Sequence, residues 1–195
     1  CSKIEYEFVT SAEKGLGKAR NIGIDLCKTE IIIFGDDDDI WHKDRVKEIK
    51  YAVEKNNPCL VKHFYNTLKN KEIKSVPLIN KPEPNPFSVG FGNLIGGGSA
   101  IAGSLSIFKA IKFKNYFYCE DWDFWIRIFL SGIKIIQINK ELITYRVHMG
   151  RMTKSFKNVY QFESMIRIKY LLRNLFFIAG LVIGFVKSTL VLLIR

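Results

Sequence analysis

The sequence of 195 residues predicts an α/β fold, with a mainly parallel sheet flanked by helices and a hydrophobic helical tail at the end. Three observations predict this fold. Apolar residues recur at helical spacing in several segments, short β-branched runs alternate with these segments, and a nearly uninterrupted apolar stretch closes the chain. With 48% apolar residues, the chain is long enough for one globular domain with a hydrophobic core.

The first part of the chain alternates between strand and helix signals. The run Ile-Ile-Ile-Phe at residues 31–34 is β-branched and aromatic, which is typical of a strand buried on both faces of a parallel sheet. In order, we expect a strand at residues 5–9, a helix with Ala19, Ile22 and Leu26 on one face, the strand at 31–34, a helix with Val46, Ile49 and Val53 on one face, and a strand at 59–65.

Four prolines between residues 77 and 86 then predict a long irregular connection, which ends at the glycines of residues 96–98. A strand is expected within residues 100–108. Trp122, Trp125 and Ile126 begin an apolar helical stripe that stops at Gly132. Two more strands are expected at residues 133–138 and 142–147, and the pattern is helical from Val159 onward.

Four consecutive aspartates, residues 36–39, directly follow the buried strand, where parallel strands open onto a ligand crevice. Adjacent carboxylates repel one another unless a cation lies among them. In an extended segment Asp36 and Asp38 would point the same way, and their hard oxygen atoms suit Mg²⁺ or Mn²⁺. A solvated acidic turn is the alternative interpretation.

A second acidic group, Glu120, Asp121 and Asp123, opens the aromatic-striped helix. The exposed amides of a helix N-terminus favour carboxylates, so Asp121 is interpreted either as a helix cap or as a chemical group. Crowding by Glu120 and Asp123 would raise the pKa of Asp121 toward a value useful for proton transfer. Such a base is needed wherever a hydroxyl has to act as a nucleophile.

Three ordered segments resemble family 2 glycosyltransferases: Gly-Leu-Gly-Lys-Ala-Arg-Asn-Ile-Gly-Ile at residues 15–24, the strand and aspartates through Trp41, and Glu-Asp-Trp-Asp-Phe-Trp-Ile-Arg from residue 120. The resemblance covers roughly residues 4–155. It implies a GT-A-type, Rossmann-like mixed sheet, and an enzyme that moves a sugar from a nucleotide-diphosphate donor to an acceptor hydroxyl. One base and a stabilised leaving group are enough for a single displacement with inversion.

The resemblance also implies roles for particular residues. Asp36 and Asp38 would hold the metal and the diphosphate, with Asp37 in a weaker role. Arg20 would reach the nucleotide. Asp121 would be the general base, with Glu120 beside it in the motif.

A closing segment, Tyr-Arg-Val-His at residues 145–148, is similar to one found near the end of the family's domain. We expect His148 to complete the metal shell or contact the diphosphate, with a purely local hydrogen bond as the alternative, and Arg151 to contact phosphate. The glycines at 96–98 either let the backbone approach a sugar or form a hinge.

The family's opening strand, with its Val-Ile-Pro-x-Tyr-Asn type of segment and the acid that reads the nucleotide base, has no counterpart here. Cys1 lies downstream of both, so we expect a sequence that lacks the first βα unit, through truncation or gene interruption. We therefore expect the 195-residue chain alone to bind nucleotide poorly and turn over little. A non-catalytic remnant of such an enzyme is the main alternative.

The basic residues gather at the end of the chain. The net charge is +11, and the residues after Gly150 include eight Lys or Arg against one acid, Glu163. Because this basic segment accompanies the apolar run at 175–194, it favours a membrane surface over nucleic acid as the partner. Lys187 within the run favours an interfacial helix over a bilayer span, and a core helix or dimer interface is the third possibility.

We therefore divide the chain into a catalytic domain at residues 1–155 and a basic, hydrophobic, membrane-associated tail at 156–195. The four cysteines are far apart and no secretory signal precedes them, which predicts a cytoplasmic protein at the inner face of the cell membrane. There the resemblance implies a saccharide or lipid-linked acceptor in bacterial surface-glycan synthesis. A membrane-surface binding module without catalysis is the rival interpretation.

Overall fold

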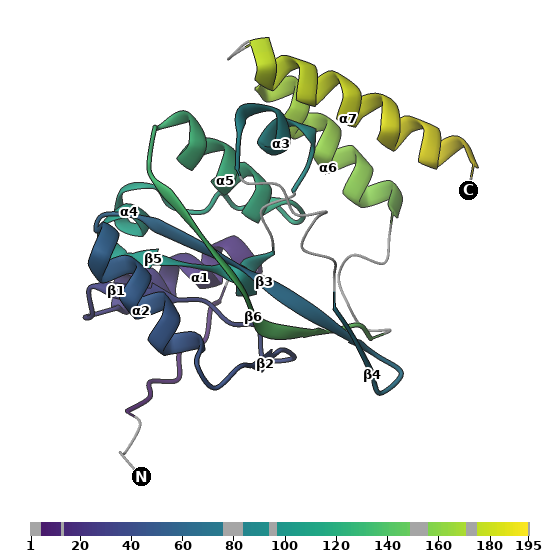
Figure 1. Ribbon diagram of the computed structural model, residues 1–195. Coiled ribbons are helices and arrows are strands. Elements are labelled where there is room, and N and C mark those ends of the chain that lie inside the picture. The colour runs from purple at the N-terminus through teal and green to yellow at the C-terminus, as the bar shows by residue number, and fades with distance from the viewer. Residues whose placement is uncertain are drawn as a thin grey trace.

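Figure 1 shows the computed structural model, which describes residues 5–12, 14–75, 84–93, 97–148, 156–170 and 175–194. A central sheet carries helices on both faces, and the two C-terminal helices lie together to one side of it. The elements in chain order are α1 (Leu16–Leu26), β1 (Ile31–Ile33), β2 (Ile40–Trp41), α2 (Arg45–Asn56), β3 (Leu60–Lys69), β4 (Glu72–Ser75), α3 (Pro86–Phe91), η2 (Gly98–Ala100), β5 (Ile101–Ser104), α4 (Leu105–Ala110), α5 (Glu120–Leu130), β6 (Ile135–Arg146), α6 (Phe156–Lys169) and α7 (Leu175–Ile194).

The strand order in the sheet is β1-β5-β3-β6-β2, with β4 paired to the far part of β3. The α/β class and the mixed sheet are confirmed, but the parallel share is smaller than expected. Among the described pairings only β3 with β6 is parallel, because β5 inserts antiparallel between β1 and β3. The strands β1, β3 and β6 therefore still run in one direction, and β1 ends at the acidic run.

Three local expectations are corrected. Residues 5–10 form no regular structure, and Tyr6 and Phe8 are almost fully exposed, because no neighbouring strand pairs with them among the described residues. The two strands expected at 133–147 are one strand, β6, whose register against β3 shifts beside His63 and Phe64. This irregularity accommodates the polar residues in the middle of β6. The strand expected within 100–108 is short and gives way to α4 at Leu105.

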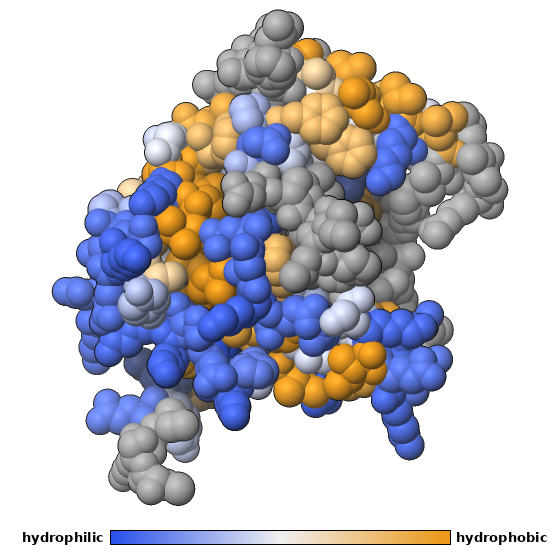
Figure 2. Space-filling model, viewed as in Figure 1, coloured by the Kyte–Doolittle hydropathy of each residue, from blue (hydrophilic) through white to orange (hydrophobic). Residues whose placement is uncertain are grey.

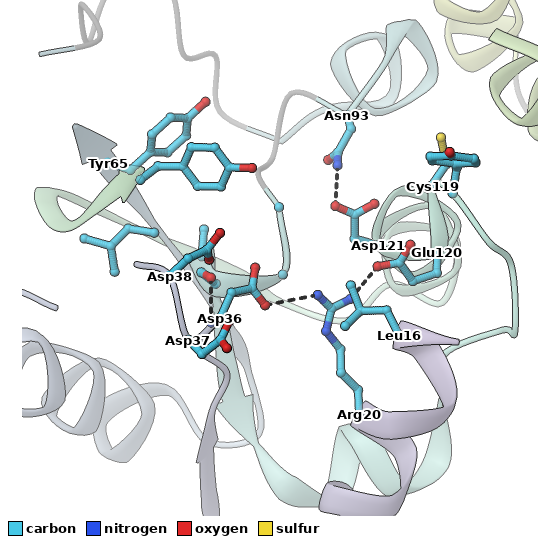
Figure 3. A pocket seen from close by; sticks show the side chains of 18 of the residues that line it. Leu16, Arg20, Asp36, Asp37, Asp38, Tyr65, Asn93, Cys119, Glu120 and Asp121 are labelled. Atoms are coloured by element: carbon cyan, nitrogen blue, oxygen red, sulfur yellow. Dashed lines mark hydrogen bonds and ion pairs between the residues drawn. The ribbon is translucent and has the colours of Figure 1, made fainter. Parts of the chain in front are cut away.

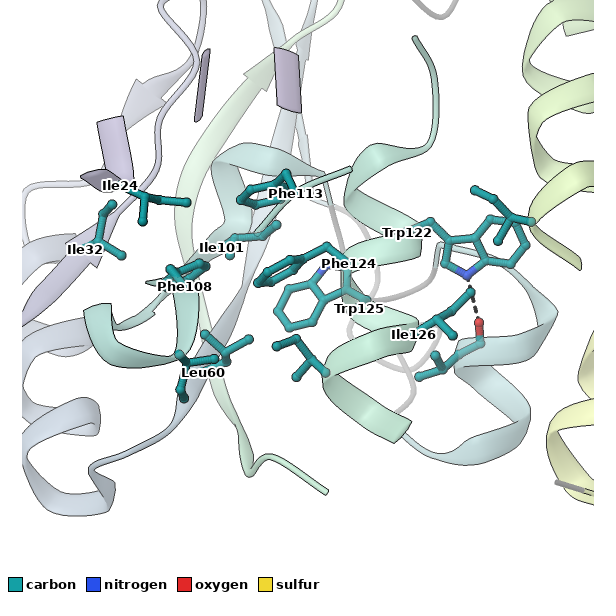
Figure 4. Packing of buried hydrophobic residues seen from close by; sticks show 14 of the residues in the cluster. Ile24, Ile32, Leu60, Ile101, Phe108, Phe113, Trp122, Phe124, Trp125 and Ile126 are labelled. Atoms are coloured by element: carbon teal, nitrogen blue, oxygen red, sulfur yellow. Dashed lines mark hydrogen bonds between the residues drawn. The ribbon is translucent and has the colours of Figure 1, made fainter. Parts of the chain in front are cut away.

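Two hydrophobic clusters cover the two faces of the sheet. One joins α1, α4 and α5 to the sheet, and the other joins α2 to the opposite face. The aromatic stripe of α5 lies at the centre of the first cluster, where Phe113 and Phe124 stack with ring centroids 4.3 Å apart (Figure 4). Burial of each large aromatic side chain contributes roughly 1.5–3 kcal/mol, so α5 is held firmly in place.

The helix α6 packs into this first cluster through Ile166 and Tyr170, and α7 packs on α3. Gly180 and Gly184 allow the close approach of α7, because a Cβ at either position would meet the backbone of Phe87 or Phe91. In the described part of the chain, no helix combines the length and apolar character needed to cross a bilayer. Hydrophobic side chains nevertheless gather over α7 in Figure 2.

Candidate functional site

A cavity of about 630 Å³ opens where the acidic run, α1, η2 and the start of α5 meet. Its walls include six charged residues singled out from the sequence, some of them separated by a hundred positions. They face one another because β1 ends at the acidic run, while α5 points its N-terminus at the same edge of the sheet (Figure 3). These six are Arg20, Asp36, Asp37, Asp38, Glu120 and Asp121.

The acidic run forms a tight loop with its carboxylates in different environments. The Asp39 amide donates to the Asp36 carbonyl at 3.3 Å, which closes a turn. Asp36 and Asp38 are partly exposed, whereas Asp39 turns inward, and one of its oxygens accepts from the Arg146 amide at 3.4 Å. Burial raises the pKa of Asp39 above its usual range. The carboxylates on the cavity wall are thus those of Asp36, Asp37 and Asp38.

His148 lies beside this loop, with its Nε2 atom 2.8 Å from Oδ2 of Asp38. This contact places His148 at the acidic loop and is compatible with a local hydrogen bond as well as with the two expected roles. Its role as a metal ligand stays a prediction. The predicted phosphate contact, Arg151, and the first glycine of the expected hinge, Gly96, lie outside the described residues.

Arg20 is buried in α1 and joins the two acidic motifs. Its Nη1 atom lies 2.6 Å from Oε1 of Glu120, and its Nη2 atom lies 3.7 Å from Oδ1 of Asp36. The guanidinium also rests against Gly98, where a Cβ would overlap it. In Figure 3 the side chain accordingly lies between Asp36 and Glu120. The sequence placed Ala19, Ile22 and Leu26 on the inner face of α1, but the buried residues are Gly17, Arg20 and Ile24.

Asp121 is held by two hydrogen bonds at the N-terminus of α5. Its Oδ1 accepts from the Trp122 amide at 2.8 Å, and its Oδ2 accepts from Nδ2 of Asn93 at 2.8 Å. Burial, and then the charge of Glu120, raise the pKa of Asp121 to about 6, although Arg20 and the two hydrogen bonds act against this. The N-cap residue of α5 is Cys119, and Asp121 lies in the first turn, where its bond to the Trp122 amide also satisfies one free N–H of the helix start.

Asp123 points away from the cavity and does not crowd Asp121, contrary to expectation. It is fully buried and accepts hydrogen bonds from Lys169 at 2.8 Å and Tyr170 at 2.7 Å, both at the end of α6, and from Arg127 at 2.7 Å. Burial alone would raise the pKa of Asp123, but these three donors outweigh it and hold the pKa below its usual range. Asp123 therefore anchors α6 to α5.

Sequence reasoning missed Asn93 and the aromatic wall of the cavity. Tyr65 and Tyr145 line the cavity from the paired strands β3 and β6, with ring centroids 6.4 Å apart. Tyr145 lay in a recognised motif, but nothing in the local pattern distinguished Tyr65 or Asn93. Their position depends on the pairing of β3 with β6 and on the course of the chain after α3.

The donor chemistry of the loop fits a small divalent cation. Among the residues described, no group of three or more His, Cys, Asp or Glu side chains is arranged to hold a metal ion. Asp36 and Asp38 nevertheless offer partly exposed carboxylates, and Mg²⁺ commonly binds one or two carboxylates with substrate phosphates and water completing its shell. The dependence on metal stays a prediction.

Comparisons with known proteins agree with this arrangement. The sequence profile of Glycosyl transferase family 2 matches residues 2–117, more than half of the chain. The chain is 26% identical to UDP-Glc:alpha-D-GlcNAc-diphosphoundecaprenol beta-1,3-glucosyltransferase WfaP of Escherichia coli, covering 83% of this chain and 61% of that protein. It is 24% identical to the amylovoran biosynthesis glycosyltransferase AmsE of Erwinia amylovora, covering 93% of this chain and 66% of that protein.

The chain thus spans less than two thirds of the length of these two relatives. Among solved structures, TarS 1-349 of S. aureus in complex with UDP-GlcNAc superposes with a TM-score of 0.66 at 16% identity, over 91% of this chain and 53% of that one. TarS 1-349 in complex with UDP gives a TM-score of 0.60 at 17% identity, over 85% and 48%. The TarS likeness shows a shared fold, and the profile match shows the family. This chain belongs to glycosyl transferase family 2.

Proposed function

We propose that this chain transfers a sugar, with inversion, from a nucleotide-diphosphate donor to the hydroxyl of a saccharide or lipid-linked acceptor in bacterial surface-glycan synthesis. The observation that carries the proposal is a carboxylate with a raised pKa, Asp121, in the same cavity as the acidic loop. The name of WfaP, which gives UDP-Glc, and the TarS complexes with UDP-GlcNAc and UDP favour a UDP-linked sugar as the donor.

In the proposed reaction the acceptor hydroxyl attacks the anomeric carbon while Asp121 takes its proton. The bond from the anomeric carbon to the diphosphate oxygen breaks, and its electron pair leaves with the diphosphate. Because one displacement occurs at that carbon, its configuration inverts. A pKa of about 6 keeps Asp121 ionised at neutral pH while leaving it basic enough to accept a proton.

The remaining residues bind and orient. The Asn93 amide and the Trp122 backbone hold the Asp121 carboxylate in one position. We retain Arg20 and Arg151 as the proposed nucleotide and phosphate contacts. Asp36 and Asp38 would hold Mg²⁺ or Mn²⁺, with Asp37 and His148 beside them, and a bound cation would supply positive charge to the leaving diphosphate.

We also propose that the molecule works at a membrane surface, where a lipid-linked acceptor would be available. Five apolar residues of α7 are between 41% and 53% exposed, although they belong to a helix that also packs on α3. A helix of this kind, in a strongly basic segment, suits the interfacial region of an anionic bilayer. The five residues are Val182, Ile183, Phe185, Val186 and Leu190.

A radiolabelled UDP-sugar assay tests the transfer proposal even if turnover is slow. With Mn²⁺ and a lipid-diphosphate acceptor, Asp121→Asn should lower the transfer rate by about 10²–10⁴-fold, the range expected for loss of a general base. Asp25→Asn, at an exposed carboxylate of α1, is the control and should keep full activity. Retained transfer by Asp121→Asn would remove Asp121 from the mechanism. Inversion is tested separately, by proton NMR of the anomeric signal of the product.

Vesicle flotation tests the membrane proposal separately. The chain should float with vesicles containing phosphatidylglycerol and not with neutral phosphatidylcholine vesicles. Val182→Ser with Val186→Ser should weaken this binding, because both side chains are about half exposed and their loss removes apolar surface without opening the core. Absence of binding to either vesicle would refute the membrane proposal, and a stable dimer in light scattering that the double variant disrupts would assign this face to a second copy of the chain.

A further inference from the structure

The acidic loop rests on a stack of three residues that lie on both sides of it in the sequence. The Trp41 indole packs directly on Gly35, where a Cβ would come within 2.8 Å of the indole Cε2 and Nε1 atoms. On Trp41 in turn lies the Arg45 guanidinium, with its Cζ 4.1 Å from the ring centroid. Gly35 directly precedes the four aspartates and Trp41 follows them after one intervening residue, Ile40, so this contact closes the loop at its base.

Arg45 is fully buried, and its hydrogen bonds extend the stack into the body of the protein. Its Nη2 atom donates to the Phe34 carbonyl at 2.7 Å and also to the Ser99 carbonyl. Its Nε atom donates to Nε2 of His63 at 3.2 Å, and the His63 Nδ1 atom donates to the Phe64 carbonyl. One side chain therefore ties the end of β1 to β3 and to the start of η2.

Ser99 carries this connection into the loop itself. Its hydroxyl accepts a hydrogen bond from the Asp36 amide at 3.0 Å. The carbonyl of the same residue accepts from Arg45. The loop is thus held at Asp36 by the Ser99 hydroxyl, at Asp39 by the Arg146 amide, and at its base by the Trp41 indole.

The positive charge of Arg45 also favours its position behind the acidic loop. Burial lowers the pKa of Arg45 to about 10, so it stays protonated at neutral pH, and the nearby Asp36 and Asp39 favour its charged form. A buried cation behind the loop offsets part of the repulsion among the carboxylates. Lysine would replace it poorly, because an ammonium group has no planar face to stack on the indole and no rigid fork to reach all three acceptors.

We propose that Gly35, Trp41 and Arg45 form a clamp, here called the loop clamp, that holds the acidic loop in its working conformation before any cation or diphosphate binds. The three are positioning residues, because they act on Asp36 and Asp38 through the loop backbone. The inference deepens the proposed function, since it rests on that loop being the site of the diphosphate and its cation. Its effect on loop order can be measured without either ligand.

Hydrogen–deuterium exchange of the metal-free chain tests the loop clamp directly. Gly35→Ala and Trp41→Ala should speed exchange in peptides covering residues 34–41 by about three- to ten-fold, the change expected from weakening a cation–π contact between a buried guanidinium and a partly exposed indole. The Asp36 and Asp39 amides report this, because both are hydrogen-bonded in the closed loop. Exchange in α5 should stay unchanged, and Gly23→Ala, where nothing lies within 4 Å of an added Cβ, should behave as the unmodified chain.

A Mn²⁺ titration followed by electron paramagnetic resonance separates this inference from the proposed function. If the unmodified chain binds Mn²⁺, the two clamp variants and Arg45→Lys should bind it about ten-fold more weakly. Trp41 is 43% exposed, so Trp41→Ala should leave the core folded even if Arg45→Lys does not. Unchanged exchange at residues 34–41 in both Gly35→Ala and Trp41→Ala would overturn the clamp, whereas absent Mn²⁺ binding by the unmodified chain would count against the proposed metal site alone.

Discussion

Replacing Gly98 by alanine should displace Arg20 and thereby separate the two acidic motifs. The added Cβ would lie 2.5 Å from the Arg20 Cζ atom, and the side chain cannot simply swing away, because it is 93% buried against Glu120 and Phe113. Displacement breaks the 2.6 Å ion pair with Glu120 and leaves a carboxylate that is also buried. A charge-assisted hydrogen bond contributes about 1.5–3 kcal/mol, and breaking a buried pair costs up to about 5 kcal/mol.

We therefore expect Gly98→Ala to lower the free energy of unfolding by about 3 kcal/mol. For a domain of this size that corresponds to a fall in Tm of about 6–12 °C, which differential scanning calorimetry measures easily. Gly97→Ala is the matched control, since among the described residues its Cβ would meet only the Asp121 carboxylate, at an ordinary 3.8 Å. Neither glycine has a positive φ, so backbone strain does not distinguish the two variants.

The same variant tests the electrostatic role of Arg20. Arg20 lowers the pKa of Asp121, so its displacement should raise that pKa and move the acid limb of the kcat/KM profile to higher pH. If Gly98→Ala and Gly97→Ala melt at the same temperature and share one pH profile, the reasoning from the Arg20 position is refuted.

Three further predictions concern the acidic residues of α5. Glu120→Gln removes the charge that raises the pKa of Asp121 and should move the acid limb of kcat/KM, expected near pH 6, to lower pH. Asp121→Asn should raise Tm at pH 7 by an amount equivalent to about 1–2 kcal/mol, a value already reduced because Asp121 is partly exposed. The pKa of Asp121 is higher in the folded than in the unfolded chain, so protonation of this carboxyl stabilises the fold below pH 4, and this stabilisation is lost as the pH rises through about 6. Asp123→Asn should cost about 3–5 kcal/mol in urea unfolding at pH 7, because Lys169 and Arg127 lose a buried partner. Because the pKa of Asp123 is lower in the folded chain, its ionised carboxylate stabilises the fold above the unfolded-state pKa, and this stabilisation is lost as the pH falls through the folded-state pKa. The loss of unfolding free energy in Asp123→Asn should therefore shrink in acid, and a loss that is the same at every pH would contradict this account.

The sequence predicted the parts of the site that depend on local order. The β-branched run before Asp36 and the aromatic stripe after Asp121 each place a carboxylate at the end of a buried element, and the local pattern identifies both elements: a continuous β-branched run for the strand and helical spacing for α5. The reaction assigned to those carboxylates came from resemblance, not from periodicity. The sheet itself was predicted less well, since the insertion of β5 between β1 and β3 leaves no local signal.

The misassigned face of α1 shows why the remaining features escaped prediction. Hydrophobic spacing pointed to Leu26, which is 42% exposed, while the helix actually buries a charged side chain, Arg20. A buried arginine is tolerable only because Glu120 lies opposite it, one hundred residues away in the sequence. Asn93 and Tyr65 belong to the same class, because their roles depend on the residues that the fold brings beside them.

Arg20 and Arg45 both offset the repulsion among the carboxylates of the cavity, from opposite sides of the acidic loop. Four carboxylates line the same cavity, and their mutual repulsion would oppose folding in the absence of a cation. They belong to Asp36, Asp38, Glu120 and Asp121. Arg20 lies between the two acidic motifs and is positioned to balance charge across the cavity, whereas Arg45 lies behind the loop and reaches it mainly through backbone and aromatic contacts. Loss of Arg20 should therefore disturb the pH dependence of Asp121 first, while loss of Arg45 should first disturb the shape of the loop. The pH profile of kcat/KM and the exchange rates of residues 34–41 distinguish these two effects, and a variant that moved both equally would show that the arginines act as one unit.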